Sequence, residues 1–180
     1  MIEIINLYKK YGKSNLFNNI NFKISDNSFA FIMGANGEGK TTLFKCLLDL
    51  EKFKGDILFD GEPFLKIIKN IFAIYDDVPF YTNLTGFQNI KLVSYKKIQV
   101  DDIDENLQLL LSIDKLNKKV STYSYGEKKK LAILIAILLK PKYLIIDELS
   151  NGLDFETISW LRENIKIIFK KSTIIATGQI

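Results

Sequence analysis

The sequence predicts an α/β fold with a mixed, mainly parallel β-sheet, an antiparallel β part at the N-terminus and an inserted helical lobe. Residues 34–41 match every fixed position of the phosphate-binding loop pattern G-x-x-x-x-G-K-[S/T], between an apolar run and a helix-like run. The β-branched runs at 144–146 and 173–176 are typical of strands buried in a parallel sheet. Between residues 83 and 119, apolar residues recur at helical spacing among charges, which predicts the lobe.

The N-terminal third of the chain predicts three strands before the loop. Residues 1–8 and 16–24 cluster β-branched and aromatic side chains on either side of a turn-prone stretch. The dipeptide Asp26-Asn27 then turns the chain into a strand at 29–33. After the loop, we expect a helix at 41–50 and a strand at 55–59, which ends at the Asp60-Gly61 turn.

The remaining elements follow from the same patterns. A helix is expected near 63–70, a strand at 71–75, a helix at 127–140, and a crossing helix at 155–171 between the two buried strands. With 180 residues, 47% of them hydrophobic, the chain can bury a sizeable core. We therefore expect a single domain, residues 1–180, in which about residues 83–122 form the helical subdomain inserted in the core.

Composition narrows the possible functions. The 25 Lys and Arg residues exceed the 21 Asp and Glu residues by only four, and the lysines are scattered, so a nucleic-acid surface is not implied. The chain has no histidine, the commonest general base and metal ligand. Its one cysteine, Cys46, is expected to be a buried free thiol in a reducing cytosol. No stretch approaches the roughly 18 apolar residues of a spanning helix, so we expect a soluble chain.

The loop pattern carries a specific chemistry. Its glycines let successive backbone N–H groups turn inward around a polyphosphate, while Lys40 places an ammonium by the terminal phosphates. Thr41 offers a hydroxyl to Mg²⁺, and the following helix points its positive dipole end at the anion. A glycine-rich turn that only caps a helix is the plainer alternative, but the flanking strand and helix favour a P-loop NTPase core. The predicted nucleotide contacts are Gly34, Ala35, Asn36, Gly37, Glu38, Gly39, Lys40, Thr41 and Thr42.

Two consecutive carboxylates, Asp147 and Glu148, close the apolar strand that follows Pro141. Because neighbouring residues on a strand point opposite ways, one carboxylate can hold Mg²⁺ through water while the next orients an attacking water. Alone, the pair would be explained as solvated charges. Together with the upstream loop, it predicts Asp147 as a metal ligand and Glu148 as the catalytic residue.

Two further segments complete a known order of motifs. Residues 123–131 read Tyr-Ser-Tyr-Gly-Glu-Lys-Lys-Lys-Leu, and residues 150–154 read Ser-Asn-Gly-Leu-Asp. With them the chain resembles, over nearly its whole length, the ATP-hydrolysing subunit of ATP-binding cassette (ABC) transporters, most closely the small exporter-type cassettes. The order is that of the family: an N-terminal aromatic residue, the phosphate loop, a Q-loop region, the signature, the acidic strand, the D-loop and a closing strand.

The resemblance implies roles for particular residues. Tyr11 would stack on adenine, although a strand-end aromatic packed on the sheet is the alternative. Ser124 and Gly126 match the signature residues that contact the terminal phosphate held by the opposite subunit; a capping box with Glu127 is the compatible structural interpretation. Asp154 resembles the D-loop aspartate, or caps the next helix.

The sequence also departs from the family pattern. Asp76 stands where a glutamine is usual, and it is expected to touch Mg²⁺ or water; Tyr125 replaces the first signature glycine. Leu149 replaces a proline without expected harm. Gly178 stands in place of the switch histidine, with Gln179 as a weaker substitute. Because a transition-state contact of this kind is worth about 10²–10³ in rate, we expect retained ATP binding with slow or partner-dependent hydrolysis.

The function implied by the resemblance is hydrolysis of ATP to ADP and phosphate, with Mg²⁺, by a dimer docked on a separate transmembrane permease at the inner face of the cell membrane. Docking is expected around residues 81–92, and relatives are expected to continue beyond Ile180. Two alternatives stay open: a soluble regulatory or assembly ATPase, and a degenerate nucleotide-binding partner in a heterodimer. Both a homodimer and a heterodimer with a second ATPase subunit stay open, and no nucleic-acid partner is expected.

Overall fold

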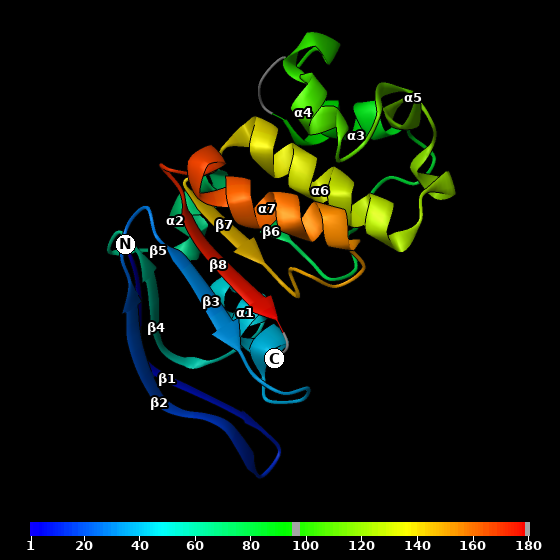
Figure 1. Cartoon of the computed structure of the whole chain (residues 1–180). Helices are drawn as coiled ribbons and strands as arrows, with labels where there is room; N and C mark the ends of the chain where they lie inside the picture. Colours follow the sequence, from blue (N-terminus) through cyan, green and yellow to red (C-terminus); the bar gives the residue numbers. More distant parts are fainter. Residues whose placement is uncertain (95–97, 179–180) are drawn as a thin grey trace. The chain divides into compact units, whose positions relative to one another are not determined.

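The computed structural model describes residues 1–94 and 98–178 (Figure 1). The chain divides into two compact units. The first unit comprises residues 1–73, 141–149 and 170–180, and the second comprises residues 74–140 and 150–169. The phosphate loop and the acidic pair lie in the first unit, and the signature lies in the second. The lobe expected at about 83–122 falls inside the second unit, and its status as a subdomain of one domain stays a prediction.

An antiparallel sheet forms one part of the first unit. Strand β1 (Ile2–Tyr11) pairs antiparallel with β2 (Ser14–Ile24) and β4 (Lys54–Phe59), and β5 (Glu62–Pro63) completes the order β2-β1-β4-β5. The register shifts between Ile4 and Leu7, where Asn6 has φ 49°. This bulge returns Leu7 to the buried face that Ile4 occupies, so that both are at most 2% exposed.

A parallel sheet supports the phosphate loop. Its order is β3 (Phe29–Met33), β8 (Thr173–Gly178), β7 (Tyr143–Ile146) and β6 (Ile71–Ile74), with β8 parallel to both β3 and β7 (Figure 1). Every residue of β7 and β8 is buried, which explains their continuous β-branched runs. Helix α1 (Lys40–Leu47) contacts β8 and buries its apolar face. The predicted combination of antiparallel and parallel strands is confirmed, as two sheets.

The second unit is helical. Its elements are α3 (Gly86–Val93), η2 (Val100–Asp102), α4 (Glu105–Gln108), α5 (Ile113–Leu116), η3 (Val120–Thr122), α6 (Tyr125–Leu139) and α7 (Phe155–Ile168), where η marks 3₁₀ turns. Residues 131–137 of α6 are all buried, as expected for a helix that is apolar on all sides. Across residues 1–94 and 98–178, we find no helix with the length and apolarity to cross a bilayer.

Several predicted bounds needed correction. The helix expected near 63–70 is only α2 (Phe64–Ile67) followed by the 3₁₀ turn η1 (Ile68–Asn70). The helix expected at 41–50 begins at Lys40 and ends at Leu47, because Asp49 adopts a left-handed φ of 54° that a continuing helix cannot contain. The signature helix begins two residues earlier than expected, at Tyr125, directly after its cap.

Candidate functional site

The phosphate-binding loop occupies residues 34–39, between the end of β3 and the start of α1. Gly37 and Gly39 have φ of 86° and 97°, in the left-handed region that glycine enters without a steric penalty. A Cβ on Gly39 would also lie 3.0 Å from the Leu16 side chain. The loop pattern therefore has the strand and helix context that gives it chemical meaning.

Lys40 folds back over this loop. Its side chain is only 7% exposed, and its Nζ donates to the carbonyl oxygens of Gly34 at 2.8 Å and Ala35 at 3.1 Å. The same Nζ lies 3.6 Å from Oε1 of Glu148. The Lys40 ammonium thus interacts both with the loop backbone and with Glu148, the predicted catalytic residue.

A loop amide already binds an anionic oxygen. The backbone N–H of Ala35 donates to Oε2 of Glu38 at 2.8 Å. At least one amide of the loop is therefore directed at an anionic acceptor, as a phosphate-binding loop requires. Asn36 and Thr41 are exposed and Thr42 is half-buried, which leaves the loop crest and the first turn of α1 accessible.

The acidic pair follows β7, which ends at Ile146 rather than within the pair. Asp147 is 3% exposed and accepts a hydrogen bond from the Thr177 hydroxyl at 2.8 Å. The hydroxyl oxygen in turn accepts from the backbone N–H of Glu148 at 2.9 Å. Sequence reasoning missed Thr177; its signal was one hydroxyl residue beside Gly178 at the end of an apolar strand.

Glu148 adopts an uncommon backbone conformation, with φ of 51°. Left-handed conformations of residues other than glycine cost about 1–3 kcal/mol and concentrate at functional sites. Glu148 faces Lys40 while Asp147 is held by Thr177, so the two neighbouring carboxylates have different partners. The sequence predicted different partners for the two carboxylates because neighbouring residues of a strand point opposite ways. In the structure, both residues follow the end of β7, and the left-handed backbone of Glu148 lies at this point.

A divalent cation site is not formed by acidic residues alone. Among residues 1–94 and 98–178, no group of three or more His, Cys, Asp or Glu side chains is arranged to hold a metal ion. Mg²⁺ usually takes one or two carboxylates together with phosphate oxygens and water. The hydroxyl of Thr41 and the carboxylate of Asp147 fit this partial ligand set.

Tyr11 lies at the end of β1 and is 51% exposed. Its hydroxyl donates to Oε1 of Glu51 at 3.0 Å, and Nζ of Lys9 lies 4.6 Å from its ring centroid. The hydrogen bond from Lys9 is also the main cause that lowers the pKa of Glu51. These contacts position the ring, and adenine stacking on Tyr11 stays a prediction.

The signature residues lie at the start of α6, in the second unit. Ser124 accepts from the backbone N–H of Glu127 at 3.2 Å, and Oε2 of Glu127 accepts from the backbone N–H of Ser124 at 2.7 Å. The expected capping box is therefore present. Gly126 must lack a side chain, because a Cβ would lie 2.2 Å from the carbonyl oxygen of Gly152.

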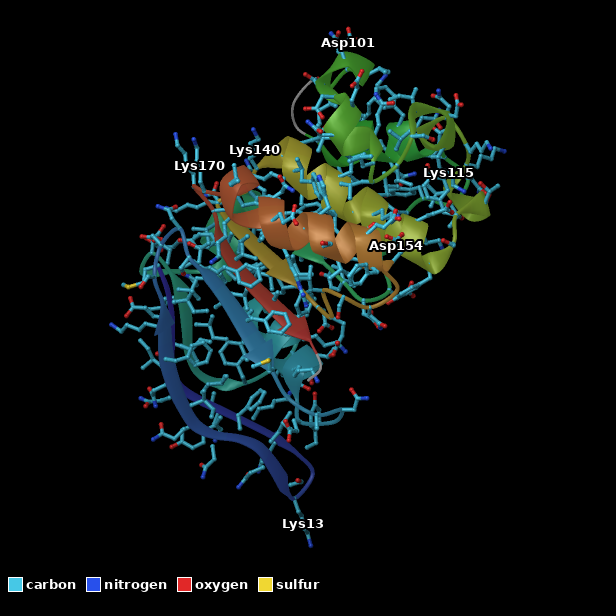
Figure 2. All side chains as sticks on the ribbon, viewed as in Figure 1. Lys13, Asp101, Lys115, Lys140, Asp154 and Lys170 are labelled. Carbon is cyan, nitrogen blue, oxygen red and sulfur yellow. The ribbon has the colours of Figure 1, made fainter. Side chains whose placement is uncertain are left out.

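Asp154 caps α7 (Figure 2), where its Oδ1 accepts from the backbone N–H of Thr157 at 2.8 Å. Its other oxygen pairs with Lys130, and this hydrogen bond is the main cause that lowers the pKa of Asp154.

Asp76 accepts hydrogen bonds from Tyr125 and Asn151, and all three residues belong to the second unit.

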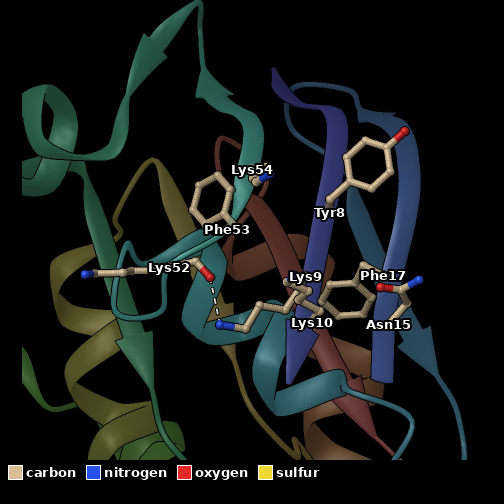
Figure 3. A pocket seen from close by; sticks show the side chains of 8 residues that line it. All are labelled: Tyr8, Lys9, Lys10, Asn15, Phe17, Lys52, Phe53 and Lys54. Atoms are coloured by element: carbon tan, nitrogen blue, oxygen red, sulfur yellow. Dashed lines mark hydrogen bonds between the residues drawn. The ribbon is translucent and has the colours of Figure 1, made fainter. Parts of the chain in front are cut away.

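A hollow of about 600 Å³ in the first unit shares no residue with the predicted site (Figure 3). It is lined by lysines, aromatic residues and one asparagine: Tyr8, Lys9, Lys10, Asn15, Phe17, Lys52, Phe53 and Lys54. Cys46 is 1% exposed, and burial raises its pKa to about 11, so this free thiol is a protonated core residue as predicted.

The switch position at Gly178 is closed by an aromatic ring. A Cβ on Gly178 would lie 2.5 Å from Cζ of Phe31, and the Phe31 ring stacks with Phe29 at 6.3 Å between centroids. Phe31 belongs to β3, which pairs in parallel with β8. The position therefore lacks a phosphate-contacting side chain, and a larger residue there would have to displace the tip of the Phe31 ring, which is 40% exposed. Gln179, the expected substitute, lies outside the described residues.

We predict that Gly178→His alone does not raise ATP turnover, because the Phe31 ring occupies the space of the new side chain. The double variant Phe31→Ala with Gly178→His should turn over ATP at least about tenfold faster than Gly178→His, since one such contact is worth about 10²–10³. Steady-state phosphate release measures both rates, with Phe31→Ala as the control. Equal rates for the single and double histidine variants would contradict the prediction.

The fold and these contacts define a class, that of P-loop nucleotide-binding proteins. Within that class the chain belongs to the ABC transporter family, whose family model matches residues 17–151. A lantibiotic transport ATP-binding protein, SrtF of Streptococcus pyogenes, is 35% identical over 169 residues, which cover 92% of this chain and 74% of that protein. The bacitracin transport ATP-binding protein BcrA of Enterococcus faecalis is 31% identical, over 98% of this chain and 62% of that protein.

Solved structures confirm the fold. A putative ABC transporter ATP-binding protein from Pyrococcus furiosus superposes with a TM-score of 0.86 at 23% identity, covering 99% of this chain and 91% of that chain. The chain also matches the uncharacterized ABC transporter ATP-binding protein YdbJ of Bacillus subtilis at 34% identity, and it spans 56% of that relative's length. The predicted fold class and family are thus confirmed.

Proposed function

We propose that the chain binds ATP with Mg²⁺ and hydrolyses it to ADP and phosphate, as the ATP-binding subunit of an ABC transporter. The observation that carries the proposal is the position of Lys40, whose ammonium is held on the loop carbonyls and lies 3.6 Å from Glu148. One cation thereby connects the phosphate-binding loop to a carboxylate that can accept a proton. Family membership and the names of the relatives support the same function.

Each residue of the first-unit site has a role in this proposal. The amides of residues 34–42 and Lys40 bind the phosphates, while Tyr11 stacks on the base. Thr41 and Asp147 would hold Mg²⁺, and the ion would supply positive charge beside the phosphate oxygens. Glu148 takes the proton of the attacking water, and its carboxylate lies 3.6 Å from Lys40 while Asp147 is held by Thr177.

Two partners follow from the family. A second ATP-binding subunit would place its Ser124 and Gly126, or their equivalents, on the terminal phosphate, because a capped helix N-terminus binds anions. A transmembrane permease would bind the assembly at the inner membrane face and supply the substrate contacts. The relatives named for lantibiotic and bacitracin transport support the permease.

A second candidate function is a nucleotide-binding partner with weak hydrolysis inside a heterodimer. The specific observation in its favour is the closed switch position, where Gly178 has no side chain and Phe31 covers the space. In such a pair the other subunit would supply the missing phosphate contact. Both candidates share ATP binding at Lys40, and turnover of the isolated chain separates them.

The proposal predicts ATP-dependent association through Ser124. In a Glu148→Gln background, Mg²⁺-ATP should convert the chain to a dimer, and Ser124→Ala should weaken that dimer at least about tenfold, since a hydrogen bond to a charged group is worth about 1.5–3 kcal/mol. Analytical ultracentrifugation with and without ATP measures the association.

The matched control for Ser124→Ala is Ser112→Ala. Ser112 also caps a helix of the second unit, and it also accepts a backbone N–H at 3.2 Å. Both variants lose a cap worth about 1 kcal/mol, but only Ser124→Ala should lose association. If both variants dimerise like the parent, Ser124 does not contact nucleotide on a second chain.

A further inference from the structure

Two departures from the family pattern meet in space. Tyr125 replaces the first signature glycine and Asp76 replaces the usual glutamine, 49 positions earlier in the chain. The Tyr125 hydroxyl donates to Oδ1 of Asp76. The side-chain amide of Asn151, in the D-loop, donates to the same oxygen at 3.0 Å. One carboxylate therefore joins three segments of the second unit.

A buried lysine, Lys129, lies close to the negatively charged carboxylate of Asp76. The side chain of Lys129 is 0% exposed, and its Nζ donates to the carbonyl oxygen of Tyr75 at 3.2 Å. The same Nζ lies 4.0 Å from Oδ1 of Asp76. A buried ammonium is stabilised by a nearby opposite charge, which aspartate provides and a neutral glutamine does not.

Backbone packing holds the same segments together. The Tyr125 ring lies over Gly152, where an added Cβ would be 2.2 Å from ring carbon Cδ1. An added Cβ on Gly126 would be 2.2 Å from the carbonyl oxygen of Gly152. The first turn of the signature helix thus fits against the D-loop only because both positions are glycine.

We propose that Asp76, Tyr125 and Asn151 form a positioning bridge, which holds the signature helix N-terminus against the D-loop so that Ser124 is oriented for a nucleotide on a second copy of the chain. Asp76 is then a positioning residue rather than the metal ligand expected from its sequence position. The inference rests on the proposed function, because it concerns the site that a second subunit completes.

Tyr125→Phe tests the bridge, since it removes one hydroxyl and keeps the ring over Gly152. In the Glu148→Gln background, the affinity of the isolated chain for ATP should stay within about twofold of the parent. ATP-dependent dimerisation should weaken about tenfold, a typical strength of coupling between sites. Tyr8→Phe, in the first unit and 41% exposed, is the matched control and should dimerise like the parent.

Asp76 variants separate a positioning role from metal binding. Asp76→Asn should weaken dimerisation as Tyr125→Phe does, because a neutral amide oxygen accepts from the Tyr125 hydroxyl less strongly than a carboxylate does. The double variant should dimerise no worse than the weaker single variant, since both changes act on the same hydrogen bond. The Mg²⁺ concentration for half-maximal turnover, measured in chains that retain Glu148, should be unchanged in both. A raised Mg²⁺ requirement in Asp76→Asn alone would assign the carboxylate to the metal and overturn the bridge. Asp101→Asn, on the exposed turn η2, is the control for the charge change.

Asp76→Asn could lose dimerisation only because the chain is less stable. A second variant, Asp76→Gln with Lys129→Gln, tests this explanation because it removes both charges together. This double variant should unfold at a higher urea concentration than Asp76→Gln alone, because it removes the buried ammonium together with the carboxylate that lies 4.0 Å from it. If the parent itself fails to dimerise with ATP, the proposed function fails. If the parent dimerises and Tyr125→Phe dimerises equally well, only the bridge fails.

Discussion

Lys40→Ala is expected to abolish ATP binding, with an affinity at least roughly 100-fold below that of the parent. The side chain is almost fully buried, and its ammonium is already placed on the loop carbonyls of Gly34 and Ala35. Hydrogen bonds to a charged group are worth about 1.5–3 kcal/mol each, and about 1.4 kcal/mol is tenfold in affinity. Titration calorimetry with Mg²⁺-ATP measures the change.

Lys45→Ala is the control for this loss, because Lys45 lies on the same helix, exposed in its last turn. It should bind ATP like the parent. Lys40→Arg keeps the charge but replaces a compact ammonium with a planar fork, so we expect it to bind poorly as well. An unchanged affinity of Lys40→Ala would remove the basis of the proposed function.

Glu148→Gln is expected to lower ATP turnover by about 10²–10⁴ while ATP binding is retained, since general base catalysis contributes that factor. The amide keeps the shape of the side chain but cannot accept the proton of the attacking water. It also removes the negative charge that lies 3.6 Å from Lys40, so that no carboxylate competes with phosphate for the ammonium. Phosphate release and nucleotide affinity are measured on the same preparation.

The control for this variant is Glu163→Gln, an exposed position on α7 that should leave turnover unchanged. Equal and negligible rates in the parent and in Glu148→Gln, with ATP affinity intact, would contradict active hydrolysis by the isolated chain. That result would favour the second candidate, the weakly hydrolysing partner in a heterodimer.

Local features were predicted well because neighbouring residues alone determine them. The loop needs contiguous glycines and one lysine, and its left-handed positions at Gly37 and Gly39 follow from residue type. The capping box at Ser124 needs only a glutamate three residues later. Errors at helix ends, such as α1 ending at Leu47, arose where a polar residue took a turn conformation within an apolar pattern.

Contacts between distant residues were not predictable in the same way. Both the switch position and the acidic pair depend on which strands lie beside β8. Phe31 closes Gly178 because β3 and β8 pair in parallel with Phe31 opposite Ala176. Thr177 supports Asp147 because β7 is the other neighbour of β8. Strand order and register are set by the packing of the whole sheet, and no local pattern encodes them.

Asp76 shows the difference most clearly. Its sequence position identified an unusual carboxylate, and the spacing of the motifs around it identified the family and the loop chemistry. Only the folded chain brings Tyr125, Lys129 and Asn151 around that carboxylate. Residue types and their spacing determine which chemistry a short segment can perform, because that chemistry needs only local backbone geometry. The partners of a side chain depend on tertiary packing, because they come from segments that meet only when the chain folds.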